Sequence, residues 1–269
     1  MSALVPRLPA HAVGTIHQFL RSHALSNERD GLVVGLSGGI DSALVARLAR
    51  DALGPEHVLG VLLPDALFSD SLKVETEEYG RSLGIQTRTI PIEALESGFR
   101  ALLPELSDRV ALGNVKARIR MIVLYTLARE RRRLVAGTGN KSEILLGYFT
   151  KYGDGGCDLL PIGDLYKTEV RALGRELALP KAVLARPPSA GLWEGQTDEG
   201  ELGISYAEAD QVLLGLEQLR TDVEIAEVTR VPLDRVREVI ERVHRYRHKR
   251  RPPPIPKVGL RTVGLDWRD

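Results

Sequence analysis

The sequence predicts an α/β fold in which helices cover both faces of a parallel β-sheet. Short apolar runs alternate with helical patterns along the first half of the chain, and the first apolar run leads directly into Ser-Gly-Gly. This alternation is typical of a doubly wound sheet, because parallel strands are joined by crossover helices. The length of 269 residues allows one large domain or two small ones.

Four strands and the helices around them are expected in order. The runs at 31–36 and 57–63 are apolar and β-branched, as in strands buried on both faces of a sheet. Two further strands are expected at 86–90 and 133–137. Helical patterns, the third with Ser69 or Asp70 as its N-cap, lie at 8–28, 41–53, 69–83, 92–103, 113–131 and 140–146.

The second half of the chain has a different character. A glycine-rich loop follows Lys151, and a long turn-rich segment follows Arg186. Loops of this length are usually mobile or functional, so we expect residues 150–157 and 186–200 to close over a ligand. We find no internal repeat and no second core. The expectation is therefore one domain over 1–269, with a core at 31–185 and a C-terminal part at 186–269 whose short helices lie at 205–216, 221–229 and 232–246.

Composition excludes several classes of protein. A net charge of +1 gives no overall electrostatic case for nucleic-acid binding. Cys157 is the one cysteine, so no intrachain disulfide can form, as expected in a reducing compartment. No apolar run is long enough to span a bilayer, and charged residues and prolines interrupt the first two dozen residues. We expect a cytoplasmic protein with no membrane partner.

The string Ser37-Gly-Gly-Ile-Asp-Ser42 lies between a predicted buried strand and a helix start. Adjacent glycines let backbone N–H groups converge on an anion, and the helix adds the positive end of its dipole. Asp41 places a carboxylate beside these groups, which is compatible with phosphates only if a divalent cation lies between them. The string therefore predicts a site for Mg²⁺ and a polyphosphate. It lacks the Gly-Lys-Ser/Thr ending of the common NTPase loop, so transfer of the terminal phosphoryl group is not expected.

This string resembles the signature of the ATP pyrophosphatases, whose adenine nucleotide α-hydrolase fold holds the phosphates that leave as pyrophosphate. Further strings are similar to those of the NAD synthetase family, and they lie in the family order at 113–121, 137–143, 147–156 and 196–203. The resemblance extends from about residue 31 to the basic tail. It implies a ligase that adenylates the nicotinate carboxylate of deamido-NAD with ATP and then amidates it.

The resemblance also implies roles for individual residues. Asp41 and Glu143 would coordinate Mg²⁺, and Asp41 and Lys167 would be catalytic. The implied ATP-binding residues are Gly35, Leu36, Ser37, Gly38, Gly39, Ile40, Asp41, Ser42, Thr138, Lys167 and Ser189, the last in place of the usual threonine. The implied contacts to deamido-NAD are Arg118, Lys151, Asp158, His248 and Lys249. Judged without the family, Arg118 could be a solvated flank, Lys167 a surface lysine and Glu143 an ordinary first-turn glutamate.

The nitrogen source is inferred from what the sequence lacks, and the assembly from the family resemblance. Amide hydrolysis needs a nucleophile with a partner, and Cys157 lacks one, so free ammonia is expected unless a separate glutaminase delivers it. The family implies a homodimer with the dinucleotide site near the subunit boundary. Three rival functions stay open at this point: a tRNA-modifying thiolase or lysidine synthetase, a non-catalytic nucleotide sensor, and RNA binding through the basic tail at 245–251.

Overall fold

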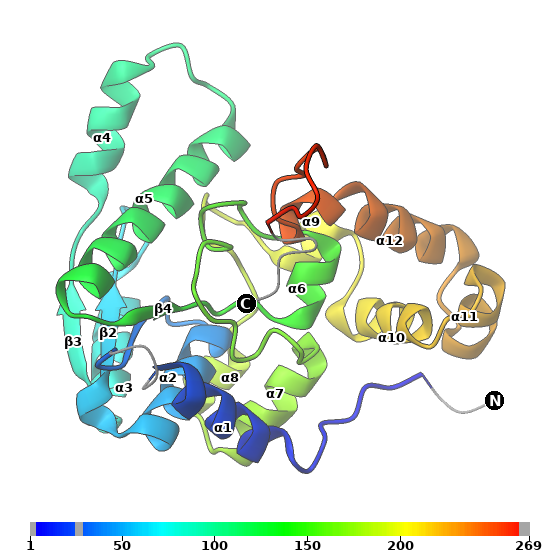
Figure 1. Ribbon diagram of the computed structural model, residues 1–269, viewed down its shortest axis with the longest axis horizontal. Coiled ribbons are helices and arrows are strands. Elements are labelled where there is room, and N and C mark those ends of the chain that lie inside the picture. Colours follow the sequence, from blue (N-terminus) through cyan, green and yellow to red (C-terminus); the bar gives the residue numbers. More distant parts are fainter. Residues whose placement is uncertain (1–3, 25–28, 264–269) are drawn as a thin grey trace.

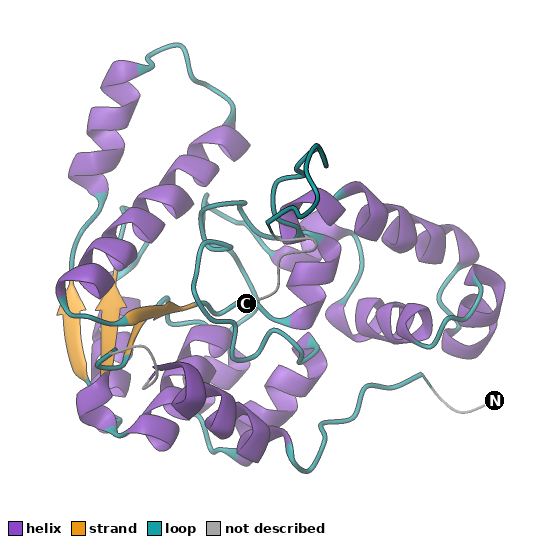
Figure 2. Ribbon diagram, in the orientation of Figure 1, coloured by secondary structure: helices purple, strands orange, loops and turns teal. Residues whose placement is uncertain are grey.

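A computed structural model describes residues 4–24 and 29–263, and it contains one parallel sheet. The strands are β1 (Leu32–Gly35), β2 (Val58–Leu62), β3 (Gln86–Thr89) and β4 (Leu134–Ala136), in the order β3-β2-β1-β4. Leu32 is paired with Val58 on one side and with Leu134 on the other. All four strands lie within the ranges predicted from the sequence (Figure 2).

Helices pack on both faces of this sheet, which confirms the doubly wound α/β fold. On one face, α2 (Ile40–Leu53) and α3 (Asp70–Ser82) cover the strands, and α1 (Ala12–Ala24) packs on α2. On the other face lies the long helix α5 (Arg109–Glu130), preceded by α4 (Glu93–Leu102). Successive strand residues alternate between two hydrophobic clusters, with Leu32 in the first and Val33 in the second. The predicted helix at 8–28 is confirmed over Ala12–Ala24, residues 8–11 precede the helix, and 25–28 lie outside the described part of the chain.

Capping residues account for the helix starts. Ser69 accepts a hydrogen bond from the N–H of Leu72, which identifies it as the N-cap of α3. Asp108 is the N-cap of α5, because its side chain accepts a hydrogen bond from the N–H of Ala111. The helix therefore begins at Arg109, four residues before the predicted start at 113. Two short 3₁₀ helices are also present, η1 (Pro55–His57) and η2 (Arg247–Arg250).

The second half of the chain is more helical than predicted. The helices α6 (Lys141–Leu146), α10 (Tyr206–Glu217), α11 (Asp222–Thr229) and α12 (Leu233–Arg245) agree with expectation. Three helices were not predicted, namely α7 (Lys167–Glu176), α8 (Lys181–Ala185) and α9 (Asp198–Leu202). The α7 helix contains Gly174, which weakens a helical pattern. In the structure this glycine lies against Ile40, where a side chain would come within 3.2 Å.

The C-terminal helices have a hydrophobic cluster that is separate from those of the sheet, a feature not expected from the sequence. Tyr206, Ile225 and Val236 are fully buried in it. Leu146 of α6 and Tyr166, just before α7, also belong to this cluster, so the extension is packed onto the core. In Figure 1, α6 lies between the sheet on the left and α10–α12 on the right. Within residues 4–24 and 29–263, no helix has the length and apolar character needed to cross a membrane.

Candidate nucleotide site at the sheet edge

The strand order changes direction between β1 and β4. The chain leads from β1 to β2 and β3 on one side, whereas β4 is added on the other side of β1. Ligands of open α/β sheets bind beyond the carboxyl ends of strands at such a switch point. Asp41 follows β1, and Thr138 and Glu143 follow β4. The topology therefore brings together residues that are about one hundred positions apart in the sequence.

The glycine turn at 37–39 has the conformation that its sequence predicts. Gly38 has φ +76°, and a Cβ there would lie 2.5 Å from the Leu72 side chain. The Ser42 hydroxyl accepts from the N–H of Ser37 at 3.2 Å and donates to the carbonyl of Gly39 at 3.0 Å. Gly39, the N-cap of α2, has no side chain to cap the helix. The first-turn N–H groups of α2 are thus suited to bind an anion.

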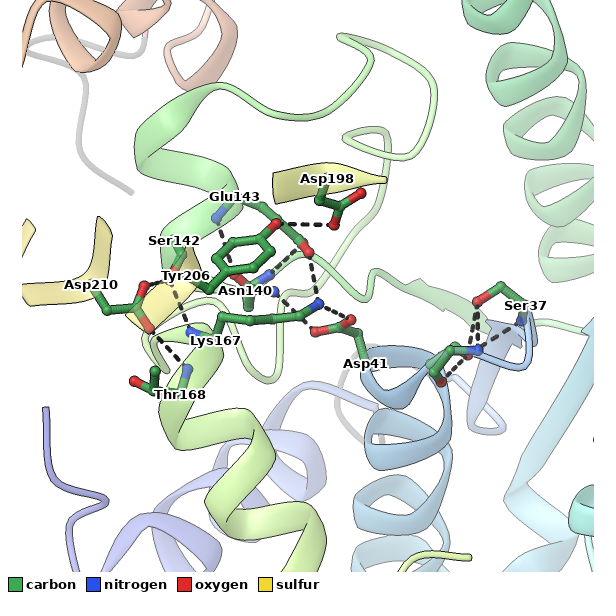
Figure 3. Close-up of polar contacts among 12 residues, drawn as sticks. Ser37, Asp41, Asn140, Ser142, Glu143, Lys167, Thr168, Asp198, Tyr206 and Asp210 are labelled. Atoms are coloured by element: carbon green, nitrogen blue, oxygen red, sulfur yellow. Dashed lines mark hydrogen bonds and ion pairs between the residues drawn. The ribbon is translucent and has the colours of Figure 1, made fainter. Parts of the chain in front are cut away.

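Two carboxylates and one lysine, which we call the Lys167 cluster, lie beside this turn (Figure 3). The Nζ of Lys167 is 2.5 Å from Asp41 Oδ2 and 3.2 Å from Glu143 Oε1. The Lys167 side chain is only 2% exposed, while those of Asp41 and Glu143 are 18% and 17% exposed. The interpretation of Lys167 as a surface lysine is therefore wrong.

The charges in this cluster are unbalanced. Burial, together with the negative charges of Asp41 and Asp198, raises the pKa of Glu143 to about 8, although Lys167 acts in the opposite direction. Burial alone would lower the pKa of Lys167, but Asp41 and Glu143 hold it above its ordinary value. One cation thus serves several carboxylates, and the site favours additional positive charge.

Asn140 organises the cluster and was not singled out from the sequence. Its Nδ2 donates to Asp41 Oδ1 at 2.9 Å, and its Oδ1 accepts from the N–H of Glu143 at 3.0 Å. Glu143 in turn accepts from the N–H of Asn140, which completes a capping box. An asparagine followed by glutamate three residues later is a readable signal for this motif. Glu143 is thus a first-turn glutamate that also faces the site.

Ser189 is engaged within its own loop. Its hydroxyl donates to the carbonyl of Gln196 at 2.7 Å and accepts from the N–H of Gly191 at 3.1 Å. The loop instead reaches the glycine turn through Arg186, which donates to the carbonyl of Gly38 and pairs with Glu75. The ATP contact predicted for Ser189 stays a prediction, and so does that of Thr138.

Four of the five residues predicted to bind deamido-NAD form a connected set. Arg118 donates to the carbonyl of Lys151 at 3.2 Å, and Lys151 donates to the carbonyl of His248 at 2.9 Å. Lys249 donates to the carbonyls of Gly147 and Phe149, each at 2.7 Å. These bonds hold the basic tail against the glycine-rich loop.

Asp158 lies apart from that set. It accepts from the hydroxyl of Tyr125 at 3.2 Å and from the N–H of Val135 at 2.8 Å, so both oxygens support β4 and α5. Its role in substrate binding is a prediction. The neighbouring Cys157 has its pKa raised to about 11, chiefly by burial, so its thiol is neutral at physiological pH. This agrees with its interpretation as a loop residue that is not a nucleophile.

The chain is similar to known proteins along most of its length. A family model described as NAD synthase matches residues 12–253. The NH(3)-dependent NAD(+) synthetase of Methanosarcina acetivorans is 48% identical over 250 residues, which cover 92% of this chain and 98% of that protein.

Solved structures give the same result. The NMN synthetase from Francisella tularensis has a TM-score of 0.82 at 33% identity, with 94% of this chain and 100% of that chain covered. The NH3-dependent NAD synthetase from Campylobacter jejuni, in complex with the nitrate ion, has a TM-score of 0.77 at 32% identity, with 91% and 98% covered. The family resemblance of the sequence motifs is confirmed. With its glycine turn, its sheet topology and a family match over nearly its whole length, the chain belongs to the NAD synthase family.

Proposed function

We propose that this chain adenylates the nicotinate carboxylate of deamido-NAD with ATP and amidates it with ammonia, giving NAD, AMP and pyrophosphate. Relatives described as NH(3)-dependent NAD(+) synthetases support this ligase activity, which was predicted from the sequence motifs. The observation that carries the proposal is the buried Lys167 ammonium between Asp41 and Glu143, directly beside the glycine turn. Family membership argues against the thiolase, lysidine synthetase and sensor alternatives.

The geometry fits a reaction that depends on positioning and electrostatic stabilisation. The first turn of α2 and the glycine turn bind the triphosphate, and Lys167 stabilises the charge that develops on the departing pyrophosphate. The substrate carboxylate forms a bond to the α-phosphorus while the bond from that phosphorus to the bridging oxygen breaks. Ammonia then attacks the carboxyl carbon, AMP leaves and a proton is released. No protein nucleophile is required in either step.

The residues present fit a magnesium ion. Asp41 and Glu143 converge on one cation, and Mg²⁺ typically binds through one or two carboxylates plus phosphate oxygens. No set of three or more His, Cys, Asp or Glu side chains in the described ranges is arranged to hold a metal, so substrate oxygens would complete the coordination. When bound there, the ion would neutralise charge on the β and γ phosphates.

The cationic set formed by Arg118, Lys151 and the tail would bind the dinucleotide phosphates. The loops at 150–157 and 186–200 would close over the adenylate and exclude water. The tail is held to the body of the protein, since Arg250 also donates to the carbonyl of Leu145 at 3.2 Å. This favours a lid over an RNA-binding arm.

We extend the proposal to assembly and location. The chain would act as a homodimer in the cytoplasm, as a single domain without nucleic-acid or membrane partners. A second substrate also merits a test, because one structural relative is described as an NMN synthetase. The carboxylate form of NMN, which we call the acid mononucleotide, is therefore a second candidate substrate that would compete with deamido-NAD for the same site.

The test is a product assay with ATP, ammonium and either deamido-NAD or the acid mononucleotide, scored for AMP and the amide. Asp41→Asn and Glu143→Gln are expected to abolish AMP formation while the fold stays intact. Asp70→Asn is the matched control, because Asp70 occupies the first turn of α3 as Asp41 does in α2, yet it is exposed. Formation of ADP and orthophosphate by the unmodified chain, or retained turnover in either variant, would refute the assignment.

A further inference from the structure

A buried polar tie connects the C-terminal extension to the helix that begins with Lys167. Asp210 of α10 is fully buried, and its Oδ1 accepts from the Ser142 hydroxyl at 2.5 Å. Its Oδ2 accepts from the N–H of Thr168 at 2.8 Å, and the Ser142 oxygen accepts from the N–H of Lys167 at 2.9 Å. Figure 3 shows these bonds to the left of the Lys167 cluster.

The tie caps the start of α7 from outside that helix. The first N–H groups of a helix have no partner within it, and here Lys167 and Thr168 donate theirs to side chains of α6 and α10. Ser142 directly precedes Glu143, so the same bonds fix the two helices that carry Lys167 and Glu143 relative to each other. A buried carboxylate is costly unless it is well hydrogen-bonded, which points to a specific role for Asp210.

We propose that Asp210 is a positioning residue for the adenylation step, which holds the Lys167 ammonium between Asp41 and Glu143 through the start of α7 and Ser142. This inference rests on the proposed function. It also gives the extension a role in catalysis, since Asp210 lies 68 positions from Ser142 in the sequence and reaches it only through the packing of α10.

The same helix makes an outer tie that serves as a matched control. Glu217, at the end of α10, accepts from Lys141 of α6 at 2.9 Å and from the Tyr166 hydroxyl at 2.5 Å. Its side chain is 50% exposed, and its hydrogen bonds go to Lys141 and Tyr166 and not to Lys167 or Ser142. Loss of this tie weakens the docking of α10 on α6 and the start of α7 without touching the inner bonds.

The experiment compares Asp210→Asn, Ser142→Ala and Glu217→Gln in the full chain with ATP, deamido-NAD and ammonium. We expect Asp210→Asn to lower kcat roughly 10- to 100-fold, as for a small misplacement of a catalytic group, with little change in the KM for ATP. Ser142→Ala should lower kcat in the same direction, and the double variant should be little worse than Asp210→Asn, because both act along one path. Glu217→Gln should keep the kcat of the unmodified chain. Equal losses in Asp210→Asn and Glu217→Gln would overturn the proposal.

A second measurement reports the position of Lys167 without any turnover. Acetic anhydride labelling, read by mass spectrometry, should modify Lys167 faster in Asp210→Asn and Ser142→Ala than in the unmodified chain or Glu217→Gln. Lys116, which is also buried, is the internal reference for an intact fold. Unchanged labelling of Lys167 in folded Asp210→Asn refutes the positioning role even if the ligase activity is correct. Faster labelling combined with ADP as the product of the unmodified chain would refute the ligase activity alone.

Discussion

Two buried clusters of acids and lysine lie near the carboxyl ends of neighbouring strands, and they differ in the number of cations available to each carboxylate. In the Lys167 cluster beyond β1, one ammonium is shared by Asp41 and Glu143. The second cluster, which we call the Lys116 cluster, lies beyond β2 and consists of Asp65, Glu96, Lys116 and Arg120. There Asp65 is 2.9 Å from Lys116 and 3.3 Å from Arg120, so two cations face the innermost carboxylate.

The pKa shifts of the two buried acids differ in sign. Burial would raise the pKa of Asp65, but Lys116 and Arg120 hold it below its ordinary value. At Glu143, the effects of burial and of the neighbouring carboxylates outweigh that of Lys167, so the pKa is raised. Asp65 also accepts from the N–H of Leu67 at 3.1 Å, so both of its oxygens are occupied.

This difference is the one expected between a structural ion cluster and the active site that we propose. The Lys116 cluster is electrostatically satisfied and links the end of β2 to α4 and α5. The Lys167 cluster has two carboxylates for one ammonium, and the raised pKa of Glu143 means that this carboxylate readily takes up a proton or pairs with a further cation. Perturbed acids of this kind gather at functional sites, where stability is traded for chemistry.

The largest effect is expected for Lys167→Met. This change removes the only cation of the Lys167 cluster, and the loss of one preorganised charge at a departing group typically costs roughly 100- to 1000-fold in kcat. The measurement is kcat for AMP formation at saturating substrates, normalised to folded protein. Lys181→Met, at the exposed start of α8, is the control for loss of a lysine. A Lys167→Met protein with more than a tenth of the normal kcat would contradict the contrast between the clusters.

The second effect concerns stability. Asp65→Asn leaves Lys116 and Arg120 without their buried partner, and breaking a buried pair on one side typically costs about 3–5 kcal/mol. The free energy of unfolding at neutral pH should fall by that order in a denaturant titration, with kcat of the folded fraction little changed. A large loss of kcat without a loss of stability would assign Asp65 to the active site instead.

The fall of stability at acid pH is a second test of Asp65. Because the pKa of folded Asp65 is lowered, its stabilising contribution is present above its unfolded pKa of about 4 and is lost as the pH falls below it. The unmodified chain should therefore lose more stability than Asp65→Asn when the pH falls from 5 to 3. Parallel curves would show that the ion pairs contribute nothing.

The extent of prediction from sequence differs between the two clusters. Asp41 and Glu143 stand in readable strings, because a glycine turn and a capping box are local patterns with local causes. Lys167 was assigned through the family resemblance, although its helix was missed. The bond between Asp65 and Lys116 spans 51 positions, and no local pattern marks either residue as a partner.

The fold shows the same division between local and long-range causes. Apolar runs located β1 and β2, because burial on both faces of a sheet leaves a continuous signal, whereas β3 reads Gln-Thr-Arg-Thr and alternates between exposed and partly buried residues. The separate hydrophobic cluster around Tyr206 and the tie through Asp210 depend on how α10 packs on α6 and α7. Such packing is set by tertiary contacts that single-sequence patterns do not record.

The smallest effect is expected for Glu96→Gln, which makes in the Lys116 cluster the same change that Glu143→Gln makes in the Lys167 cluster. Glu96 lies 3.8 Å from Lys116 and 3.3 Å from Arg100, whose side chain is 51% exposed, so it is an outer member of a cluster already satisfied by Asp65. Glu96→Gln should lower the free energy of unfolding by less than Asp65→Asn does, because its ion pair with Lys116 is longer and its other partner is exposed, and it should leave kcat unchanged. Glu143→Gln, by contrast, should stop AMP formation. If both variants lost activity to the same degree, buried acids near the sheet edge would act through general electrostatics, and the distinction between a satisfied and an unsatisfied cluster would fail.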